Sequence, residues 1–308
     1  MSAYPEVTGP DPSADPQLAA LLQSLRDQHD DAISAVLVYG SCLRSGDIYD
    51  GLLDLYLICD SYRAAYGTGT LAVANWLLPP NVFYAQQAGE GRTLRAKVTV
   101  ISLGDFRRGC SLAWFESYIW GRFAQPTHIL YARDGAAREA VGDALLEAVR
   151  TLLTRTLPAL PTSGSLEELW KGALGLSYGT ELRTERSGRA GELVRANAAF
   201  YAAVTAHHAA ALGHGFSLRG NAYHSAPGGL SRALTRTAWR LRGVQGKLLS
   251  IARLVKALFT FEGGLDYIAW KLERHSGETI VIPDKVRRRP LVHLWGFFWG
   301  LYQRGIFK

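Results

Sequence analysis

Residues 33–41, with the sequence ISAVLVYGS, are the strongest indication of the fold in this sequence. The β-branched, apolar run predicts a buried strand that ends at Gly40 and Ser41. A second apolar run, LLDLYLI at 52–58, carries Asp54 and predicts a neighbouring strand. A glycine lets the backbone approach a phosphate, a serine hydroxyl can hold phosphate oxygens, and a strand carboxylate can bind magnesium. The two runs therefore predict a phosphate and metal site where the strands meet.

The sequence on either side of these strands predicts further helices and strands. The apolar spacing indicates helices over 17–29, 112–123 and 134–157, and strands over 96–102 and 127–132. Four strands among helices favour an α/β fold with a small mixed sheet.

A proline- and serine-containing stretch, PALPTSGS at 158–165, predicts a linker between two domains. The sequence after it is almost entirely of helical pattern. We therefore expect a flexible leader over 1–16, a mixed-sheet domain over 17–160, a mainly helical domain over 161–283 and a basic, aromatic tail over 284–308.

The positive charge lies in the C-terminal quarter of the chain. The whole sequence carries a net charge of +7, whereas residues 232–308 have 15 Lys or Arg against 5 Asp or Glu, a net charge of +10. A one-sided positive field predicts an anionic partner, either nucleic acid or acidic lipid. Three cysteines without metal-binding spacing indicate a reducing compartment, and the first residues predict neither a signal nor a transit peptide.

The tail combines aromatic and basic residues. Trp295, Phe297, Phe298 and Trp299 lie within five positions, and Arg287 to Arg289 precede them. This pattern is typical of an amphipathic segment that anchors at a membrane interface. The apolar run is too short to cross about 30 Å of hydrocarbon as a helix. The alternative is a terminal helix that packs on the protein's own core.

Five sequence blocks follow one another in an order that resembles a known family. They are Tyr39-Gly40-Ser41 with Leu53-Asp54-Leu55 and Asp60; Lys97 with Val100-Ile101-Ser102; Trp114, Tyr118, Gly121, Arg122 and Pro126; Gly175-Leu176-Ser177-Tyr178 with Glu181 and Arg183; and Lys256 with Phe259-Thr260. A Gly-Ser strand end followed by a strand aspartate is typical of nucleotidyltransferases, which usually carry two strand acids. The blocks, with their single strand aspartate, resemble the mitochondrial-type phosphatidate cytidylyltransferases, the CDP-diacylglycerol synthases of the translocator assembly and maintenance family.

The resemblance implies a nucleotidyltransferase-like domain that transfers CMP from CTP to phosphatidic acid with Mg²⁺ as cofactor. It implies these roles: Asp54 as metal ligand and, with Lys97, as catalytic residue; Tyr39, Gly40, Ser41, Arg122, Ser177 and Tyr178 in nucleotide binding; and Asp60, Glu181, Arg183 and Lys256 in substrate contact or support of the site. The expected partners are CTP, phosphatidic acid and an anionic membrane surface, not nucleic acid. The expected location is peripheral, on the cytoplasmic face of a membrane or on the matrix face of an organellar inner membrane.

The sequence also departs from the family pattern and leaves alternatives open. Phe83-Tyr84-Ala85 stands where the family has His-Tyr-Ser, and Glu181 stands where it has an aspartate. Lys97 could be a solvated strand residue and Asp60 a turn former. The rival functions are a nucleotidyltransferase with a soluble or nucleic-acid acceptor and a non-catalytic nucleotide-binding relative.

Overall fold

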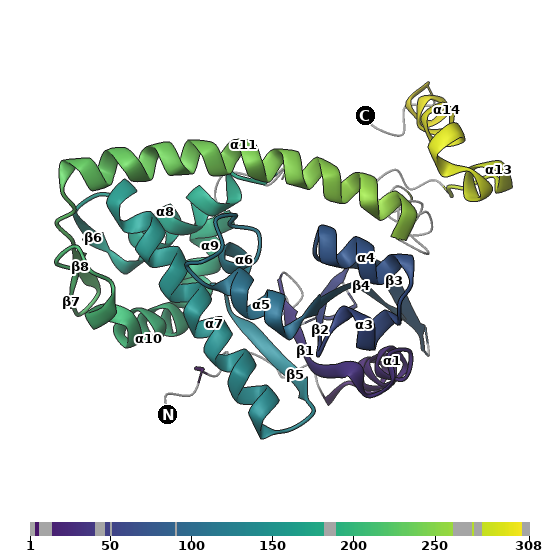
Figure 1. The fold of residues 1–308 in the computed structure, drawn as a ribbon, viewed down its shortest axis with the longest axis horizontal. Helices are drawn as coiled ribbons and strands as arrows, with labels where there is room; N and C mark the ends of the chain where they lie inside the picture. Colours follow the sequence, from purple (N-terminus) through teal and green to yellow (C-terminus); the bar gives the residue numbers. More distant parts are fainter. Residues whose placement is uncertain are drawn as a thin grey trace.

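The protein has an α/β fold built around a five-stranded mixed sheet (Figure 1). The computed structural model describes residues 4–5, 14–40, 47–49, 51–89, 91–181, 189–260, 273 and 279–303. The sheet has the order β3-β4-β2-β1-β5. Its strands are β1 (Ile33–Tyr39), β2 (Leu53–Cys59), β3 (Asn81–Ala88), β4 (Thr93–Ser102) and β5 (Thr127–Ala132). A second sheet, of order β6-β8-β7, contains β6 (Ser163–Ser165), β7 (Ser217–Arg219) and β8 (Ala222–His224).

Helices cover both faces of the large sheet and form most of the second half of the chain. They are α1 (Pro16–Asp27), α3 (Tyr62–Tyr66), α4 (Thr70–Leu77), α5 (Leu103–Cys110), α6 (Trp120–Phe123), α7 (Gly135–Thr156), α8 (Leu166–Tyr178), α9 (Arg189–Ala196), α10 (Ala198–His208), α11 (Gly229–Thr260), α13 (Asp284–Arg288) and α14 (Pro290–Gln303). Short 3-10 helices lie at Asp30–Ala32, Leu157–Ala159 and Ala209–Ala211.

The strand pairing brings the ends of β1 and β2 together. Strand β2 pairs antiparallel with β1 and parallel with β4, while β3 and β5 pair antiparallel at the two edges. All seven residues of β1 are buried, because its apolar side chains alternate between two hydrophobic cores. One core lies against α1 and α3. The other lies against α5, α6 and α7 and continues through α8 and α10 to Trp239.

Most of the predicted elements are present with small shifts of their ends. The predictions of the strands β1, β2, β4 and β5 and of the helices α1 and α7 are confirmed. Helix α1 begins at Pro16, where the Asp15 carboxylate accepts hydrogen bonds from the N–H groups of Gln17 and Leu18. The hydrophobic core runs across the predicted linker at 158–165, since α7 and α8 both contribute to it.

The predicted helix over 112–123 is wrong, because only its last four residues form a helix, α6. The Arg155 guanidinium donates hydrogen bonds to the carbonyl oxygens of Leu112 and Trp114, so those carbonyls are bound from outside their own segment. Strand β3 was not predicted, because its sequence, NVFYAQQA, follows two prolines and contains weak strand formers.

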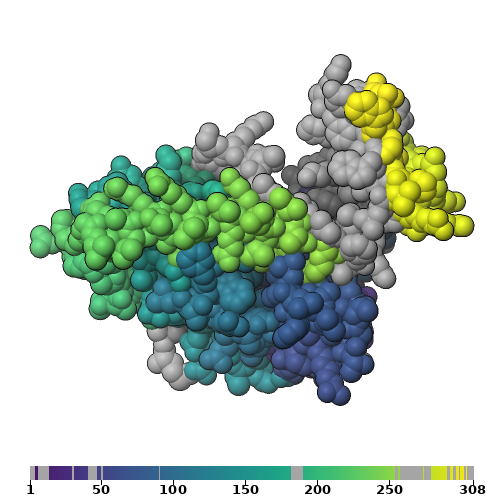
Figure 2. Space-filling model, turned by 45° about the horizontal axis from the view of Figure 1, so that its top comes forward, coloured from purple at the N-terminus to yellow at the C-terminus, as the bar shows by residue number. Residues whose placement is uncertain are grey.

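The C-terminal part of the described chain consists of α11, which lies across the molecule, and of α13 and α14 beyond its end (Figure 1). Figure 2 shows α11 along one face of the molecule. Among the helices of the described ranges, none combines the length and the apolar character needed to cross a lipid bilayer.

Candidate active site

A row of polar side chains crosses the large sheet at the end where β1 reaches Gly40. Tyr39 lies opposite Asp54, Asp54 lies opposite Lys97, and Lys97 lies opposite Tyr84. Partnered residues of a sheet project to the same face, so this register places Asp54 and Lys97 side by side. The Lys97 ammonium nitrogen is 3.7 Å from a carboxylate oxygen of Asp54, and both side chains are about 30% exposed. The pair is therefore loosely held and open to a ligand.

Gly40 brings the backbone directly against the Asp54 carboxylate. Its φ of +103° is one that residues with a side chain rarely adopt, and a Cβ atom there would lie 3.1 Å from Oδ2 of Asp54. Only glycine fits this position without strain. Ser41, the next predicted nucleotide-binding residue, lies outside the described residues, so its prediction is left as it stands.

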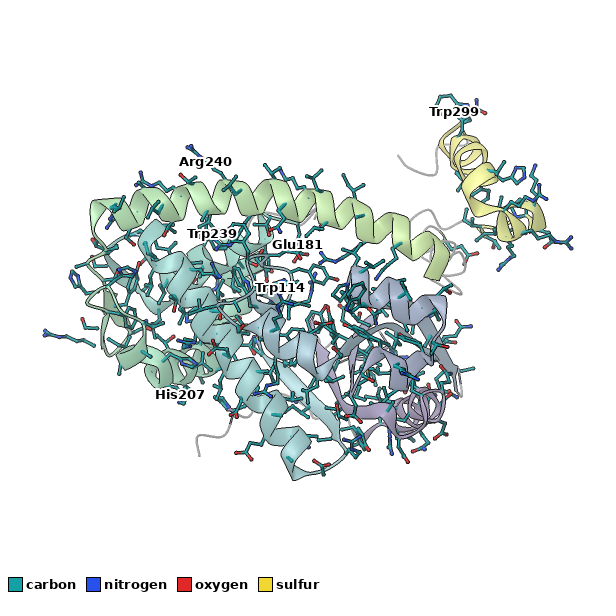
Figure 3. The ribbon with its side chains drawn as sticks, viewed as in Figure 1. Trp114, Glu181, His207, Trp239, Arg240 and Trp299 are labelled. Carbon is teal, nitrogen blue, oxygen red and sulfur yellow. The ribbon has the colours of Figure 1, made fainter. Side chains whose placement is uncertain are left out.

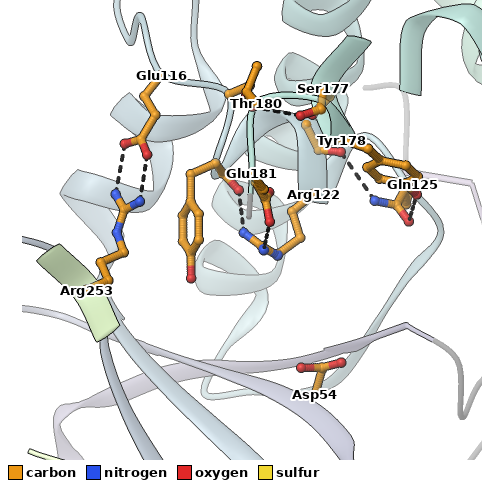
Figure 4. Close-up of polar contacts among 12 residues, drawn as sticks. Asp54, Glu116, Arg122, Gln125, Ser177, Tyr178, Thr180, Glu181 and Arg253 are labelled. Carbon is orange, nitrogen blue, oxygen red and sulfur yellow. Dashed lines mark hydrogen bonds and ion pairs between the residues drawn. The ribbon is translucent and has the colours of Figure 1, made fainter. Parts of the chain in front are cut away.

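Arg122 of α6 lies on the side of the sheet toward which Asp54 points (Figure 4). Its guanidinium donates to Oε2 of Glu181 at 2.8 Å and to the carbonyl oxygen of Tyr118 at 2.7 Å. Burial alone would lower the pKa of Arg122, but Glu181 and the surrounding tyrosines raise it well above its usual value. Arg122 is thus a permanently charged, buried cation, and its Nε–H group has no hydrogen-bond partner among the described residues.

A second buried ion pair joins α11 to the same place. The Arg253 guanidinium donates two hydrogen bonds to Glu116, at 2.6 and 2.8 Å (Figure 4). It donates a third to the carbonyl oxygen of Pro79 at 3.1 Å. The guanidinium carbons of Arg253 and Arg122 both lie 4.0 Å from the centre of the Tyr118 ring. Two cations therefore stack on one aromatic ring.

The charges around Tyr118 connect the two ion pairs to the polar row on the sheet. Burial would raise the pKa of the Tyr118 phenol, but the positive charges of Arg122, Lys97 and Arg253 together lower it. The positive charges of Lys97 and of both buried arginines therefore all act on the Tyr118 phenol. The sequence analysis missed Glu116 and Arg253, although the position of Arg253 one helical turn before Lys256 was a usable signal.

Lys256 holds α11 to the connection between α4 and β3. Its ammonium group donates to the carbonyl oxygens of Leu78 and Pro80, the second at 2.7 Å. Burial and the nearby charge of Arg253 lower the pKa of Lys256 to about 8. These hydrogen bonds hold α11 beside the segment that follows α4, and the predicted role of Lys256 in substrate contact or support of the site stays a prediction.

Ser177 and Tyr178 lie at the end of α8, where this helix packs closely on α6. A Cβ atom on Gly121 would lie 1.9 Å from the Ser177 hydroxyl oxygen, so the glycine permits the close approach. Ser177 is 1% exposed, and the Tyr178 hydroxyl donates to Gln125 at 3.1 Å. These contacts position the end of α8, from which Glu181 reaches Arg122. The predicted nucleotide contacts of Ser177 and Tyr178 stay predictions.

Asp60 lies at the other end of β2 and is not brought near Asp54. Asp60 is six positions after Asp54 along the strand, a distance of about 20 Å in extended backbone. Asp60 accepts two hydrogen bonds from Arg133, at 2.7 and 3.2 Å. The two aspartates therefore cannot hold the same metal ion. Arg183, the remaining predicted residue, lies outside the described residues.

The donor set fits one kind of magnesium site. Within the described ranges, no group of three or more His, Cys, Asp or Glu side chains could hold a metal ion. Mg²⁺ commonly binds to one or two carboxylates and completes its coordination with substrate phosphates and water. Asp54 could supply the one protein carboxylate for an ion that arrives with a polyphosphate. Among the described residues, no set of side chains could hold a metal without such a ligand.

The positive side chains of the site are already paired with carboxylates, so a polyphosphate ligand would need a divalent cation to compensate its charge. Glu181 and Glu116 already compensate the charges of Arg122 and Arg253, and Lys97 lies beside Asp54. A nucleoside triphosphate would need further positive charge, which a divalent cation supplies. No protein-family model matches this chain, and a search of curated proteins finds no match.

Proposed function

We propose that this protein is a Mg²⁺-dependent phosphatidate cytidylyltransferase that forms CDP-diacylglycerol and pyrophosphate from CTP and phosphatidic acid. The observation that carries the proposal is the pair of Asp54 and Lys97 in the polar row at one end of the mixed sheet, with the Gly40 backbone against Asp54 and the buried Arg122 on the same side. The resemblance to the cytidylyltransferase family supports the proposal, because it implies Asp54 and Lys97 in catalysis, and these two residues are partners on the mixed sheet.

The reaction is a displacement at phosphorus. A phosphate oxygen of phosphatidic acid attacks the α-phosphorus of CTP, the bond from that phosphorus to the bridging oxygen breaks, and pyrophosphate leaves with the bond electrons. The attacking phosphate is largely ionised near neutral pH, so the reaction needs no general base. Catalysis then comes mainly from positioning and charge compensation.

The residues of the site divide this work between them. Magnesium, when bound to Asp54 and the nucleotide, supplies compensation for the triphosphate charge. The backbone at Gly40 can approach a phosphate closely, because no Cβ atom intervenes. Lys97, which lies on the strand next to Asp54, binds a phosphate oxygen of the nucleotide. Arg122, whose Nε–H group is unused, stabilises negative charge at the site from its buried position.

The membrane part of the proposal places the protein at a lipid surface, because its acceptor is a phospholipid. The basic, aromatic tail at 284–308 would dock there, on a cytoplasmic or matrix face. The structure describes helices α13 and α14 in this tail, with Val292 and Trp299 exposed. Interfacial binding through exposed aromatic and basic side chains is favourable at an anionic leaflet.

The deciding experiment incubates the protein with Mg²⁺, CTP labelled in the cytosine ring and vesicles that contain phosphatidic acid. We expect the label to move into the lipid extract and pyrophosphate to appear in equal amount. Parallel reactions replace phosphatidic acid with single-stranded RNA or with glycerol 3-phosphate. Transfer to either would favour a soluble or nucleic-acid acceptor instead. Binding of CTP without any transfer would favour a non-catalytic relative, which is the alternative that the single strand carboxylate suggests.

A further inference from the structure

Helix α11 carries a continuous row of large apolar side chains on its outer side. We call this row the α11 ridge; it consists of Leu230, Leu234, Leu241, Val244, Leu248 and Ile251, which are 50–75% exposed. Their spacing of three, four or seven residues places them on one side of the helix over a length of about 30 Å. The opposite side of α11 packs on the protein, where Trp239, Arg242 and Arg253 are largely buried. In Figure 3, Trp239 points toward the protein and Arg240 away from it.

The charge along α11 is of one sign. Its 32 residues include seven Lys or Arg and no Asp or Glu. Arg236, Arg240 and Lys247 are exposed beside the ridge. A second copy of this helix would bring like charges together, so the charge disfavours self-association. An exposed apolar row with basic flanks instead fits a surface that combines apolar groups with negative charge, such as the interface of an anionic membrane.

A second exposed apolar group lies next to the C-terminal half of α11. Val73, Trp76 and Leu77 of α4 are 53–71% exposed. The hydrogen bonds from Arg253 and Lys256 to the carbonyl groups that follow α4 hold this helix beside α11. Exposed tryptophan is favoured at the headgroup level of a bilayer. Nearly all the large apolar side chains exposed in the described residues lie on α4, α11 or α14.

We propose that the α11 ridge, extended by Trp76 and its neighbours on α4, is a docking surface for an anionic lipid bilayer, separate from the tail at 284–308. The proposal rests on the proposed function, because a lipid acceptor gives this surface its purpose. Helix α11 lies along the bilayer, its leucines enter the headgroup region, and its arginines contact lipid phosphates. Arg253, on the inner side of the same helix, stacks on Tyr118 above the polar row of the sheet. Docking therefore brings the bilayer to the helix that lines the candidate active site.

The test measures sedimentation of the full-length protein with vesicles of phosphatidylcholine and phosphatidylglycerol. Phosphatidylglycerol is anionic but is not the proposed acceptor, so this readout does not depend on catalysis. We expect Leu241→Gln combined with Leu248→Gln to weaken vesicle binding roughly ten- to a hundredfold, because two apolar side chains no longer enter the interface. Val281→Gln is the matched control: Val281 is 78% exposed and lies outside α4, α11 and α14, so its loss should leave binding unchanged.

A second set of variants tests the same surface without changing the ridge. Arg236→Gln and Arg240→Gln should each weaken binding about fivefold at low salt and less at high salt. Trp76→Ser should weaken it at all salt concentrations. These side chains are exposed, so their replacement should leave the thermal unfolding temperature near that of the wild type.

Three outcomes would overturn the proposal. Equal sedimentation of the wild type and the ridge variants would mean that the ridge does not touch lipid. Failure of the wild type to bind anionic vesicles would point to an acidic protein partner. A wild-type dimer that the ridge variants convert to monomers, measured by analytical ultracentrifugation, would make the ridge a contact between copies. Ridge-dependent vesicle binding without any CMP transfer would leave this proposal standing and reject the proposed function.

Discussion

The two ends of β2 each carry an aspartate, but in different settings. At one end, Asp54 lies 3.7 Å from Lys97, beside the glycine backbone and facing the buried arginines. At the other end, Asp60 is bound by two hydrogen bonds to Arg133. An aspartate already satisfied by a guanidinium fork has little to offer a ligand. The aspartate at one end of the strand is thus only loosely paired, whereas the aspartate at the other end is held by an arginine.

The same contrast separates the ion pairs of the candidate site. The pairs Arg122–Glu181 and Arg253–Glu116 are short and largely buried, whereas Asp54–Lys97 is longer and about 30% exposed. Breaking a buried pair leaves an uncompensated charge, while opening an exposed one costs little. The buried pairs therefore fix the positions of the segments around the candidate site. The exposed pair of Asp54 and Lys97 is the one whose partners a ligand could replace.

The sharpest test of this contrast is the same substitution at both ends of β2. On the proposed function, Asp54→Asn should reduce CMP transfer about a thousandfold, because it removes the carboxylate that we propose to bind the metal. Asp60→Asn should leave transfer within about twofold, since it removes only an exposed ion pair. Initial rates with labelled CTP measure both, and circular dichroism checks the fold. Equal losses in the two variants would contradict the assignment of Asp54.

Glu116→Gln should mainly affect stability. It leaves the buried Arg253 without its counter-charge and should lower the free energy of unfolding by about 3 kcal/mol. Glu167→Gln is the matched control, because the Glu167–Arg195 pair is exposed and should contribute less than about 1 kcal/mol. Urea unfolding followed by circular dichroism compares them. A similar, small loss in both would show that the Arg253 pair is not structural.

Gly40→Ala should distort the end of β1 where it meets Asp54. The positive φ and the 3.1 Å approach to the carboxylate together should cost about 2 kcal/mol and lower the transfer rate about tenfold. Gly67→Ala separates the two causes, because Gly67 has a φ of +65° but no atom within 4 Å of the added Cβ. The control should lose stability without losing transfer once both variants are assayed well below their unfolding temperatures. Equal transfer by both variants would argue against a tight fit at Gly40.

The smallest expected effect is the pH dependence that Lys256 confers. Its pKa of about 8 in the folded protein lies below the usual value of 10.5. Between these two pH values the unfolded chain holds a proton that the folded protein has released, so stability should rise with pH across this window. The change should be on the order of 1 kcal/mol, because the side chain is only partly buried. Lys256→Met should flatten this rise, which is measured as the difference in the free energy of unfolding between the wild type and the variant at each pH. The same dependence on pH in both proteins would show that Lys256 titrates normally.

Much of the sheet and part of the site followed from local sequence. The apolar runs predict β1, β2 and β4, and the period of two within each run fixes which residues share a face. Once Tyr39, Asp54 and Lys97 are assigned to these strands, pairing in register is enough to align them. Gly40 could also be predicted, because a glycine that ends a buried strand indicates a tight backbone approach.

The tertiary structure decided everything that depends on residues far apart in the chain. Glu116 and Arg253 are 137 positions apart, so no local pattern could pair them. The segment before α6 has helical composition but is not helical, because Arg155 binds its carbonyl groups from α7. Asp54 and Asp60 look alike in sequence, but Arg133 from a distant strand end binds Asp60, whereas Lys97 and the Gly40 backbone lie beside Asp54. The sequence by itself determined the strands and the polar residues on them, since these follow from local hydrophobic patterns. Only the folded chain decided which charges are compensated and which side of α11 is exposed, because both depend on packing between distant segments.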